Sequence, residues 1–151
     1  MKKQSTALMV LAAIVGLPAA IGGARFLAYN DNKAPCDSPV AISSVEKLGV
    51  ALPSGAKVCS ADKGTGASRE FQVLLERPSI LCFASLGYAG CRSTAEAGQS
   101  LLAPMTGAGW GTGKLTSSED GGLFEFEREE QWATFQVFRS KYGELTASLR
   151  L

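Results

Sequence analysis

The chain has 151 residues and a formal net charge of +1, enough for one domain and a targeting segment. Once Lys2 and Lys3 are set aside, residues 25–151 carry 13 basic and 14 acidic side chains. Such a balance lacks the basic surface of a nucleic-acid-binding protein. No histidine is present, which removes the commonest general base and a very common metal ligand, so we expect neither a metal nor a cofactor.

The N-terminus has the pattern of an export signal, because Lys2 and Lys3 precede the uncharged run ALMVLAAIVG. Two outcomes are open. A signal peptidase cuts between Ala24 and Arg25, or residues 7–24 stay in the membrane as a helix of about 27 Å, close to the thickness of the hydrocarbon core. Apolar sequence continues past the cut site and favours the uncut form. Both outcomes place the rest of the chain outside the cytoplasm.

The sequence divides into three parts. Residues 1–28 are the signal or membrane anchor, residues 29–40 form a linker rich in Pro, Asn and Asp, and residues 41–151 form the exported domain. We expect an α+β fold: an antiparallel β-sheet with one main helix covering one face, preceded by the N-terminal apolar helix.

Four cysteines follow the export segment, and an even number in an exported chain predicts two disulfides. Three pairings are possible. We favour Cys82–Cys91, which closes the short loop CFASLGYAGC, together with Cys36–Cys59, which ties the N-terminal extension to the domain. No C-x-x-C motif indicates a redox site or a zinc ribbon.

The first part of the domain has mixed signals. Residues 41–50 predict either a short helix capped by Ser43 or Ser44, or an irregular strand. A short strand is expected around residues 56–60, followed by a glycine-rich loop.

Two apolar runs follow. REFQVLLER (69–77) alternates as a strand does, with Phe71, Val73 and Leu75 on one face. SILCFASL (79–86) predicts a second strand, because β-branched and aromatic residues favour that structure, although so short a run also allows a helix.

Residues 91–110 predict the main helix. Ser93 or Thr94 caps it, and Glu96 lies three residues after Ser93, as in a capping box. Apolar residues recur on one face at four-residue intervals: Ala97, Leu101 and Met105. Pro104 interrupts this pattern and is expected to kink or end the helix.

The remaining sequence alternates strongly. EDGG (119–122) separates two strands and predicts a hairpin turn, and residues 131–140 and 143–151 predict two further strands. These strands form an antiparallel meander whose apolar face needs a cover, and the helix within residues 93–107 provides one.

Two short motifs suggest a family. The helix ends in Met105-x-x-x-Gly109-Trp110, and Leu52–Gly55 reads L-P-x-G. In these features, roughly residues 50–150 resemble small exported bacterial α+β domains of unknown function, in which a helix ending L-x-x-x-G-W precedes an antiparallel meander. The resemblance implies that fold and a non-enzymatic role, although Pro104 departs from the usual uninterrupted helix.

One charge cluster is present, formed by Glu119, Asp120, Glu125, Glu127, Glu129 and Glu130. Glu125 and Glu127 offer a carboxylate pair for acid–base chemistry, or ligands for calcium, but EF-hand spacing is absent. Strand alternation alone produces such a solvated face, and we favour that interpretation. GWGTGK (109–114) lacks the spacing of a phosphate-binding loop.

Four aromatic residues are candidates for binding a partner: Trp110, Trp132, Phe138 and Tyr142. For Trp110 we favour packing in the core, because the end of the main helix needs an apolar contact with the sheet.

These features predict an exported binding or structural domain rather than an enzyme. Our first hypothesis is a membrane-tethered accessory subunit of an envelope assembly, with an unidentified protein partner. The alternative is a secreted inhibitor or immunity-type protein, which acts on an enzyme through residues 83–91 or the acidic hairpin. A small hydrolase that uses Glu125 and Glu127 ranks third.

Overall fold

A computed structural model describes residues 16–17, 19–28, 36, 39–59, 67–85, 89–118 and 121–151 of the chain. The fold is α+β, as expected, and the chain forms two compact units. One comprises Met1–Lys33 with Pro78–Cys91, and the other comprises Ala34–Arg77 with Arg92–Leu151. Residues 78–91, which the sequence places inside the exported domain, therefore belong with the N-terminal segment.

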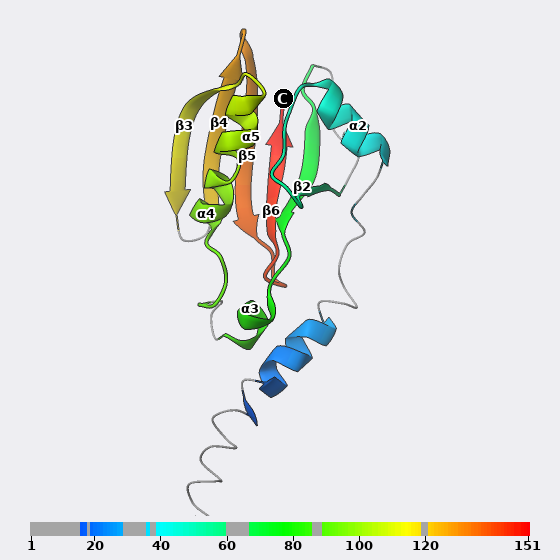
Figure 1. Cartoon of the computed structure of the whole chain (residues 1–151), viewed down its shortest axis with the longest axis vertical. Coiled ribbons are helices and arrows are strands. Elements are labelled where there is room, and N and C mark those ends of the chain that lie inside the picture. The colour runs from blue at the N-terminus through cyan, green and yellow to red at the C-terminus, as the bar shows by residue number, and fades with distance from the viewer. Residues whose placement is uncertain are drawn as a thin grey trace, which may run out of the picture. The chain divides into compact units, whose positions relative to one another are not determined.

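The larger unit is built on an antiparallel sheet of six strands in the order β1-β2-β6-β5-β4-β3 (Figure 1). The strands are β1 Lys57–Val58, β2 Glu70–Glu76, β3 Gly111–Ser118, β4 Gly121–Arg128, β5 Gln131–Arg139 and β6 Leu145–Arg150. Strands β3 to β6 form the predicted meander. Strand β6 also pairs with β2, so the last strand in chain order lies inside the sheet.

Apolar and polar residues alternate along the strands, and this alternation places one face of the sheet in the core, as the sequence predicts. The buried side chains of this face include Phe71, Val73, Phe124, Phe126, Ala133, Phe135, Val137, Leu145, Ala147 and Leu149. Phe126 and Phe135 lie on neighbouring strands and pack edge to face, with ring centroids 5.9 Å apart. This continuous apolar layer fixes the register of the strands, because a slip of one residue would expose it.

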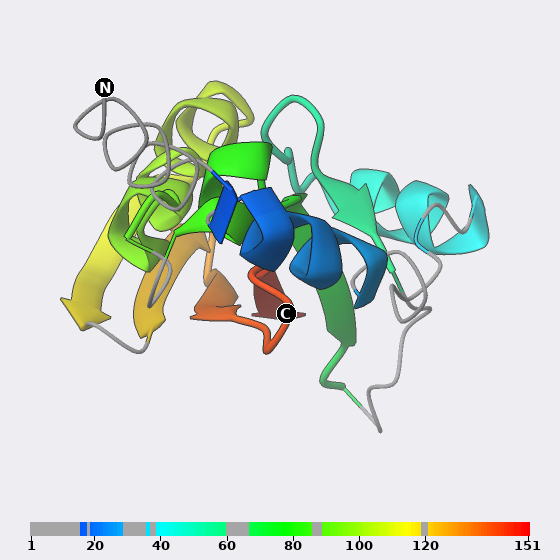
Figure 2. The same ribbon diagram turned by 90° about the horizontal axis from the view of Figure 1, so that it is seen from below.

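Three helices cover the core face (Figures 1 and 2). They are α2 Pro39–Lys47, α4 Thr94–Gln99 and α5 Leu102–Gly107. The predicted apolar face of the main helix is buried, and Val45 of α2 joins the same core. The expectation of one main covering helix therefore missed the share of the cover that α2 provides.

The predicted main helix is divided into two short helices. The capping box is confirmed, since the Ser93 hydroxyl accepts from the Glu96 N–H and the Glu96 carboxylate accepts from the Ser93 N–H. Helix α4 ends at Gln99 and α5 begins at Leu102. The break lies one turn before Pro104, which has no N–H to donate to the carbonyl of Ser100.

The prediction of a strand over residues 79–86 is wrong. The segment contains a helix, α3 Ile80–Ala84, and the Ser79 side chain caps it by accepting from the N–H of Cys82. This cap satisfies a free N–H group at the start of the helix and outweighs the strand preference of the apolar run.

Of the two alternatives for residues 41–50, the helix is correct, but its start is not at Ser43 or Ser44. Helix α2 begins at Pro39, inside the predicted linker, and both serines lie within it. Proline suits the first position of a helix, where an N–H has no partner in the helix.

Both favoured disulfides are present, Cys36–Cys59 in the larger unit and Cys82–Cys91 in the smaller. Two disulfides are typical of proteins that fold in an oxidising compartment outside the cytoplasm. Over the ranges given above, no helix has both the length and the apolar character needed to cross a bilayer.

Candidate functional site

The turn between β4 and β5 has a backbone conformation that its residues disfavour. Two residues, Glu129 and Glu130, connect the strands, with φ angles of 47° and 68°. A two-residue turn with positive φ at both positions matches the twist of the strands but normally contains Asn or Gly. No other non-glycine residue in the described ranges has a positive φ. The fold around this turn therefore compensates for local strain.

Arg128 supplies much of that compensation on the core side of the hairpin. Its guanidinium lies 4.4 Å from the centre of the Trp110 ring and donates to the carbonyls of Leu48 at 3.0 Å and Ala108 at 3.5 Å. These contacts join the end of β4 to the residues that follow α2 and α5. A charged donor on carbonyl oxygens and a cation over an indole are both favourable, so they hold the hairpin end in place.

Trp132 occupies the outer face of the same hairpin end. It lies directly opposite Glu127 and is 53% exposed. Its ring reaches across β4 to Gly113 of β3, where an added Cβ would lie 3.5 Å from the ring. Glycine at this position leaves a flat backbone surface on which the indole rests, so Trp132 is both exposed and supported.

The hairpin end encloses a surface depression of about 740 Å³. Its lining residues are Gly109, Gly111, Glu127, Arg128, Glu129, Glu130 and Trp132, three acidic residues against one basic residue. The guanidinium of Arg128 is occupied by carbonyls and by an indole, so the free surface is acidic and aromatic. Such a surface attracts a cation, and an exposed indole next to it also offers apolar contact area.

The structure separates the six predicted partner-binding residues. Trp110 is 3% exposed and donates from Nε1 to the carbonyl of Gly49, so its assignment to a binding surface is wrong and core packing is correct. Trp132, Glu125 and Glu127 share the outer face of the hairpin.

Phe138 and Tyr142 lie toward the opposite end of β5. Phe138 is 37% exposed and follows Trp132 by six residues, a separation of roughly 20 Å along a strand. Tyr142 belongs to the next turn, where the ammonium of Lys141 lies 4.9 Å from its ring. These two residues therefore do not form one patch with Trp132.

The carboxylate pair Glu125 and Glu127 projects from the outer face of β4, opposite Thr134 and Trp132. Within the residues that the structure describes, no three His, Cys, Asp or Glu side chains are grouped closely enough to hold a metal ion. Glu119 and Asp120 lie outside the described residues.

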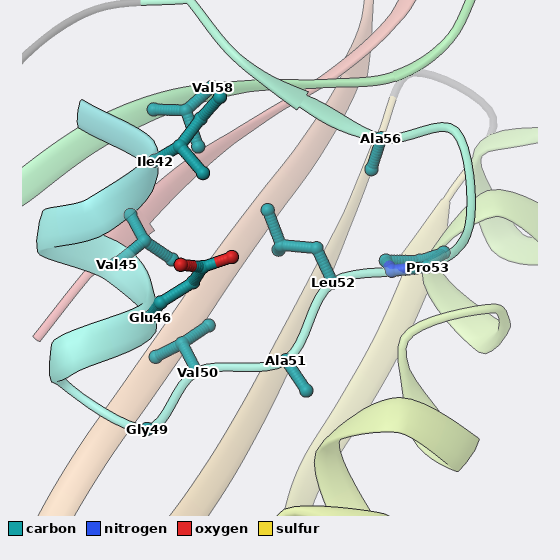
Figure 3. Close-up of a pocket in the computed structure, with 10 residues that line it drawn as sticks. All are labelled: Ile42, Val45, Glu46, Gly49, Val50, Ala51, Leu52, Pro53, Ala56 and Val58. Carbon is teal, nitrogen blue, oxygen red and sulfur yellow. The ribbon is translucent and has the colours of Figure 1, made fainter. Parts of the chain in front are cut away.

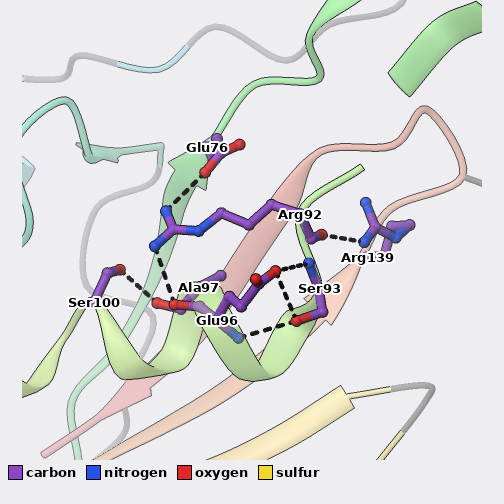
Figure 4. A network of polar contacts seen from close by, with 7 residues as sticks. All are labelled: Glu76, Arg92, Ser93, Glu96, Ala97, Ser100 and Arg139. Carbon is purple, nitrogen blue, oxygen red and sulfur yellow. Dashed lines mark hydrogen bonds and ion pairs between the residues drawn. The ribbon is translucent and has the colours of Figure 1, made fainter. Parts of the chain in front are cut away.

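A polar network ties the start of α4 to the far end of β5 (Figure 4). Arg92 binds Glu76 at 2.9 Å and donates to the carbonyl of Glu96, while Arg139 donates to the carbonyl of Arg92. The N–H and then the hydroxyl of Ser93 hydrogen-bond to the Glu96 carboxylate and lower the pKa of Glu96 below its ordinary value of 4.5. The network is exposed and its groups are bonded to one another, so we assign it a structural role.

An apolar hollow of about 530 Å³ lies between α2 and residues 49–58 (Figure 3). Glu46 is the one charged side chain among its lining residues, and its carboxylate extends into the hollow beside Leu52. A ligand site needs several convergent polar groups, and a single flexible carboxylate does not provide them.

Sequence reasoning missed three features of the hairpin end. Arg128 is the one basic residue within the acidic run EFEREE, and its isolated charge indicates a specific contact elsewhere in the fold. Gly113 lies within GWGTGK, which lacks the spacing of a phosphate-binding loop, although glycine within a strand often marks a close approach. The Glu129–Glu130 turn carries no turn signal in the sequence.

Comparison of the chain with protein-family models, with curated proteins and with solved structures finds no match.

Proposed function

We propose that this chain is a non-enzymatic exported domain that stays tethered to the membrane and binds a protein partner through the β4–β5 hairpin end. The observation that carries the proposal is the environment of Trp132. Its indole is more than half exposed, is supported by Gly113 and lies beside Glu127. Tryptophan is enriched among the residues that dominate protein interfaces.

The chemistry of the hairpin end favours a basic partner surface. Glu127, Glu129 and Glu130 line one depression together with Arg128, whose guanidinium is engaged with the core. A lysine or arginine of the partner would meet both a carboxylate and the face of an indole, which attract it by charge and by cation–π interaction. Because Arg128 holds the hairpin in one conformation in the free protein, binding of a partner loses little conformational entropy of the hairpin.

Contacts of the N-terminal helix support the tethered form. Within the smaller unit, a helix over residues 19–28 packs on α3. Gly22 lies against Ala84, and Phe26 packs on Phe83 with ring centroids 5.8 Å apart. The predicted cut after Ala24 would fall between these two contacts and separate them.

Site-specific photo-crosslinking in cells tests partner binding. A photoreactive phenylalanine analogue in place of Trp132 should yield a discrete crosslinked protein, whereas the same probe in place of Lys141, at the other end of β5, should not. Charge reversal by E127K and E129K should abolish the product. Equal crosslinking at the two positions, or a product that survives charge reversal, would contradict the proposal.

A secreted inhibitor is the second candidate, because a rigid hairpin with an exposed tryptophan also suits the blocking of an enzyme. Intact mass measurement on protein from cells separates the two. A mature chain that begins at Arg25 favours the inhibitor, and a chain that retains residues 1–24 favours the tethered subunit.

A further inference from the structure

Helix α3 exposes two large aliphatic side chains next to each other. Ile80 and Leu81 are 68% and 71% exposed, while Cys82 and Phe83, the next two residues, are buried. One side of this short helix therefore packs inside the smaller unit, and its first turn projects an apolar pair outward. Water is an unfavourable environment for so much aliphatic surface at one place.

The N-terminal helix holds α3 in this orientation. Arg25 donates to the carbonyl of Phe83 at 3.2 Å and to the carbonyl of Ser85, so it binds two carbonyl groups at the end of α3. Phe26 covers the ring of Phe83, and the Cys82–Cys91 disulfide closes the loop that follows. Ile80 and Leu81 therefore belong to a braced element that adjoins the predicted membrane segment.

The sequence of the smaller unit also fits a lipid environment. Residues 78–91 contain no Lys, Arg, Asp or Glu, and neither do residues 4–24. These two uncharged stretches come together in one compact unit. Leu17 and Leu27, on the N-terminal side of the unit, are exposed as well. Segments that rest in a bilayer interface combine apolar exposure with an absence of charge at the buried surface.

We propose that the first turn of α3 is a second membrane contact, in which Ile80 and Leu81 enter the lipid interface beside the tether. The inference rests on the tethered form of the proposed function. A contact of this kind would limit rotation of the tethered chain at the membrane surface. The occupant of the apolar pair is lipid, rather than a protein partner or a second copy of the chain.

Tryptophan quenching by brominated lipids tests the contact. The full chain is reconstituted in vesicles of phosphatidylethanolamine and phosphatidylglycerol, with W132F as the background. This background retains the buried Trp110, so the emission of the W132F parent is subtracted from that of each probe variant. The emission of the indole introduced by L81W should fall by roughly half when the acyl chains are brominated near the headgroup. I80W is a second probe of the same surface, in case L81W folds poorly. L115W is the matched control, because Leu115 is an exposed leucine of the larger unit.

The outcomes separate the contact from the tether. Vesicle flotation reports whether the chain is membrane-bound, and quenching reports whether α3 touches lipid. Flotation without quenching of the L81W and I80W probes beyond the L115W control overturns the contact and leaves the tether standing. A blue-shifted emission without quenching indicates that protein covers the pair, which also overturns the proposal. Failure to float overturns both the tether and the contact, and leaves partner binding to the crosslinking experiment.

Discussion

The turns at the two ends of strand β5 both contain residues with positive φ angles, but they accommodate these angles with different residues. At the far end, Gly143 takes the positive φ of 84°, and the Ser140 hydroxyl accepts from the N–H groups of Tyr142 and Glu144. At the near end, Glu129 and Glu130 take positive φ angles without glycine or asparagine. We call the turn at Glu129 and Glu130 the near turn, and the turn around Gly143 the far turn.

Each turn has an arginine beside it, and the difference lies in what that arginine does. Arg139 donates to the carbonyl of Gly143 within its own turn and to the carbonyl of Arg92. Arg128 makes a contact across its own turn, to the side-chain oxygen of Gln131 at 3.5 Å, and its other contacts reach the core around Trp110 and the carbonyls of Leu48 and Ala108. The turn around Gly143 is stabilised chiefly by hydrogen bonds among its own residues, whereas the turn at Glu129 and Glu130 depends chiefly on the long-range contacts of Arg128. A conformation maintained against local preference is a candidate for function.

The largest expected effect is that of Arg128→Ala, which removes a charged donor from two carbonyls and a cation from the Trp110 ring. We expect a loss of about 2–3 kcal/mol in the free energy of unfolding, measured by urea denaturation. Arg139→Ala is the matched change at the far end and should cost less. A larger loss for Arg139→Ala would mean that the near turn does not depend on its arginine in the way described.

A second prediction concerns backbone strain at the far turn. Gly143→Ala places a side chain at a φ of 84° and should destabilise the protein by about 1–2 kcal/mol. Glu130→Ala is the control, because position 130 already carries a side chain at positive φ and should change stability by less than about 0.5 kcal/mol. Equal losses for the two variants in urea denaturation would refute the assignment of strain.

Relief of strain at the near turn is the third prediction. The double variant Glu129→Asn, Glu130→Gly supplies the residues that this turn prefers and should raise the free energy of unfolding by about 0.5–1 kcal/mol. The same variant removes two carboxylates and should weaken the crosslink at position 132. A variant that is no more stable than the parent would show that the glutamates carry no strain.

The smallest expected effect is a dependence of the free energy of unfolding on acid pH, caused by Glu96 at the start of α4. Bonding to Ser93 lowers the pKa of Glu96 in the folded protein below 4.5, so its stabilising contribution is fully present above pH 4.5 and is lost as the pH falls through the folded pKa. Glu96→Gln should therefore be less stable than the parent at neutral pH, and the difference should shrink in acid. A difference that is constant from pH 7 to pH 3 in urea denaturation would contradict this.

Much of the larger unit is predictable from sequence because its signals are local and periodic. The alternation around Phe135 and Ala147 fixes which face is buried, and the spacing from Ser93 to Glu96 gives the capping box. The prediction of a strand over residues 79–86 is wrong because it followed the β-branched and aromatic composition of the run. The helix-capping residue Ser79 was the stronger signal, and it indicates a helix.

The candidate site was harder to predict for a different reason. Trp132 and Glu127 were identified as single candidates, but their pairing follows from the register of two strands. The tertiary contacts of Arg128 join residues 20 and 80 positions away, which no local pattern encodes. Trp110 was the easier residue to place, because its position after the predicted main helix favours the core packing that the structure has.

The position of β6 bears on when the larger unit acquires its structure. Strand β6, Leu145–Arg150, is the last strand in chain order, yet it lies between β2 and β5 and contributes Leu145, Ala147 and Leu149 to the core. Until this segment emerges, β2 has no partner on that side and the meander is unfinished. Folding must therefore wait for nearly the whole sequence, because the pairing that closes the sheet is between distant residues. This order of strands suits the proposed export, because a chain that completes its sheet last remains unfolded long enough to cross a membrane as an extended polypeptide.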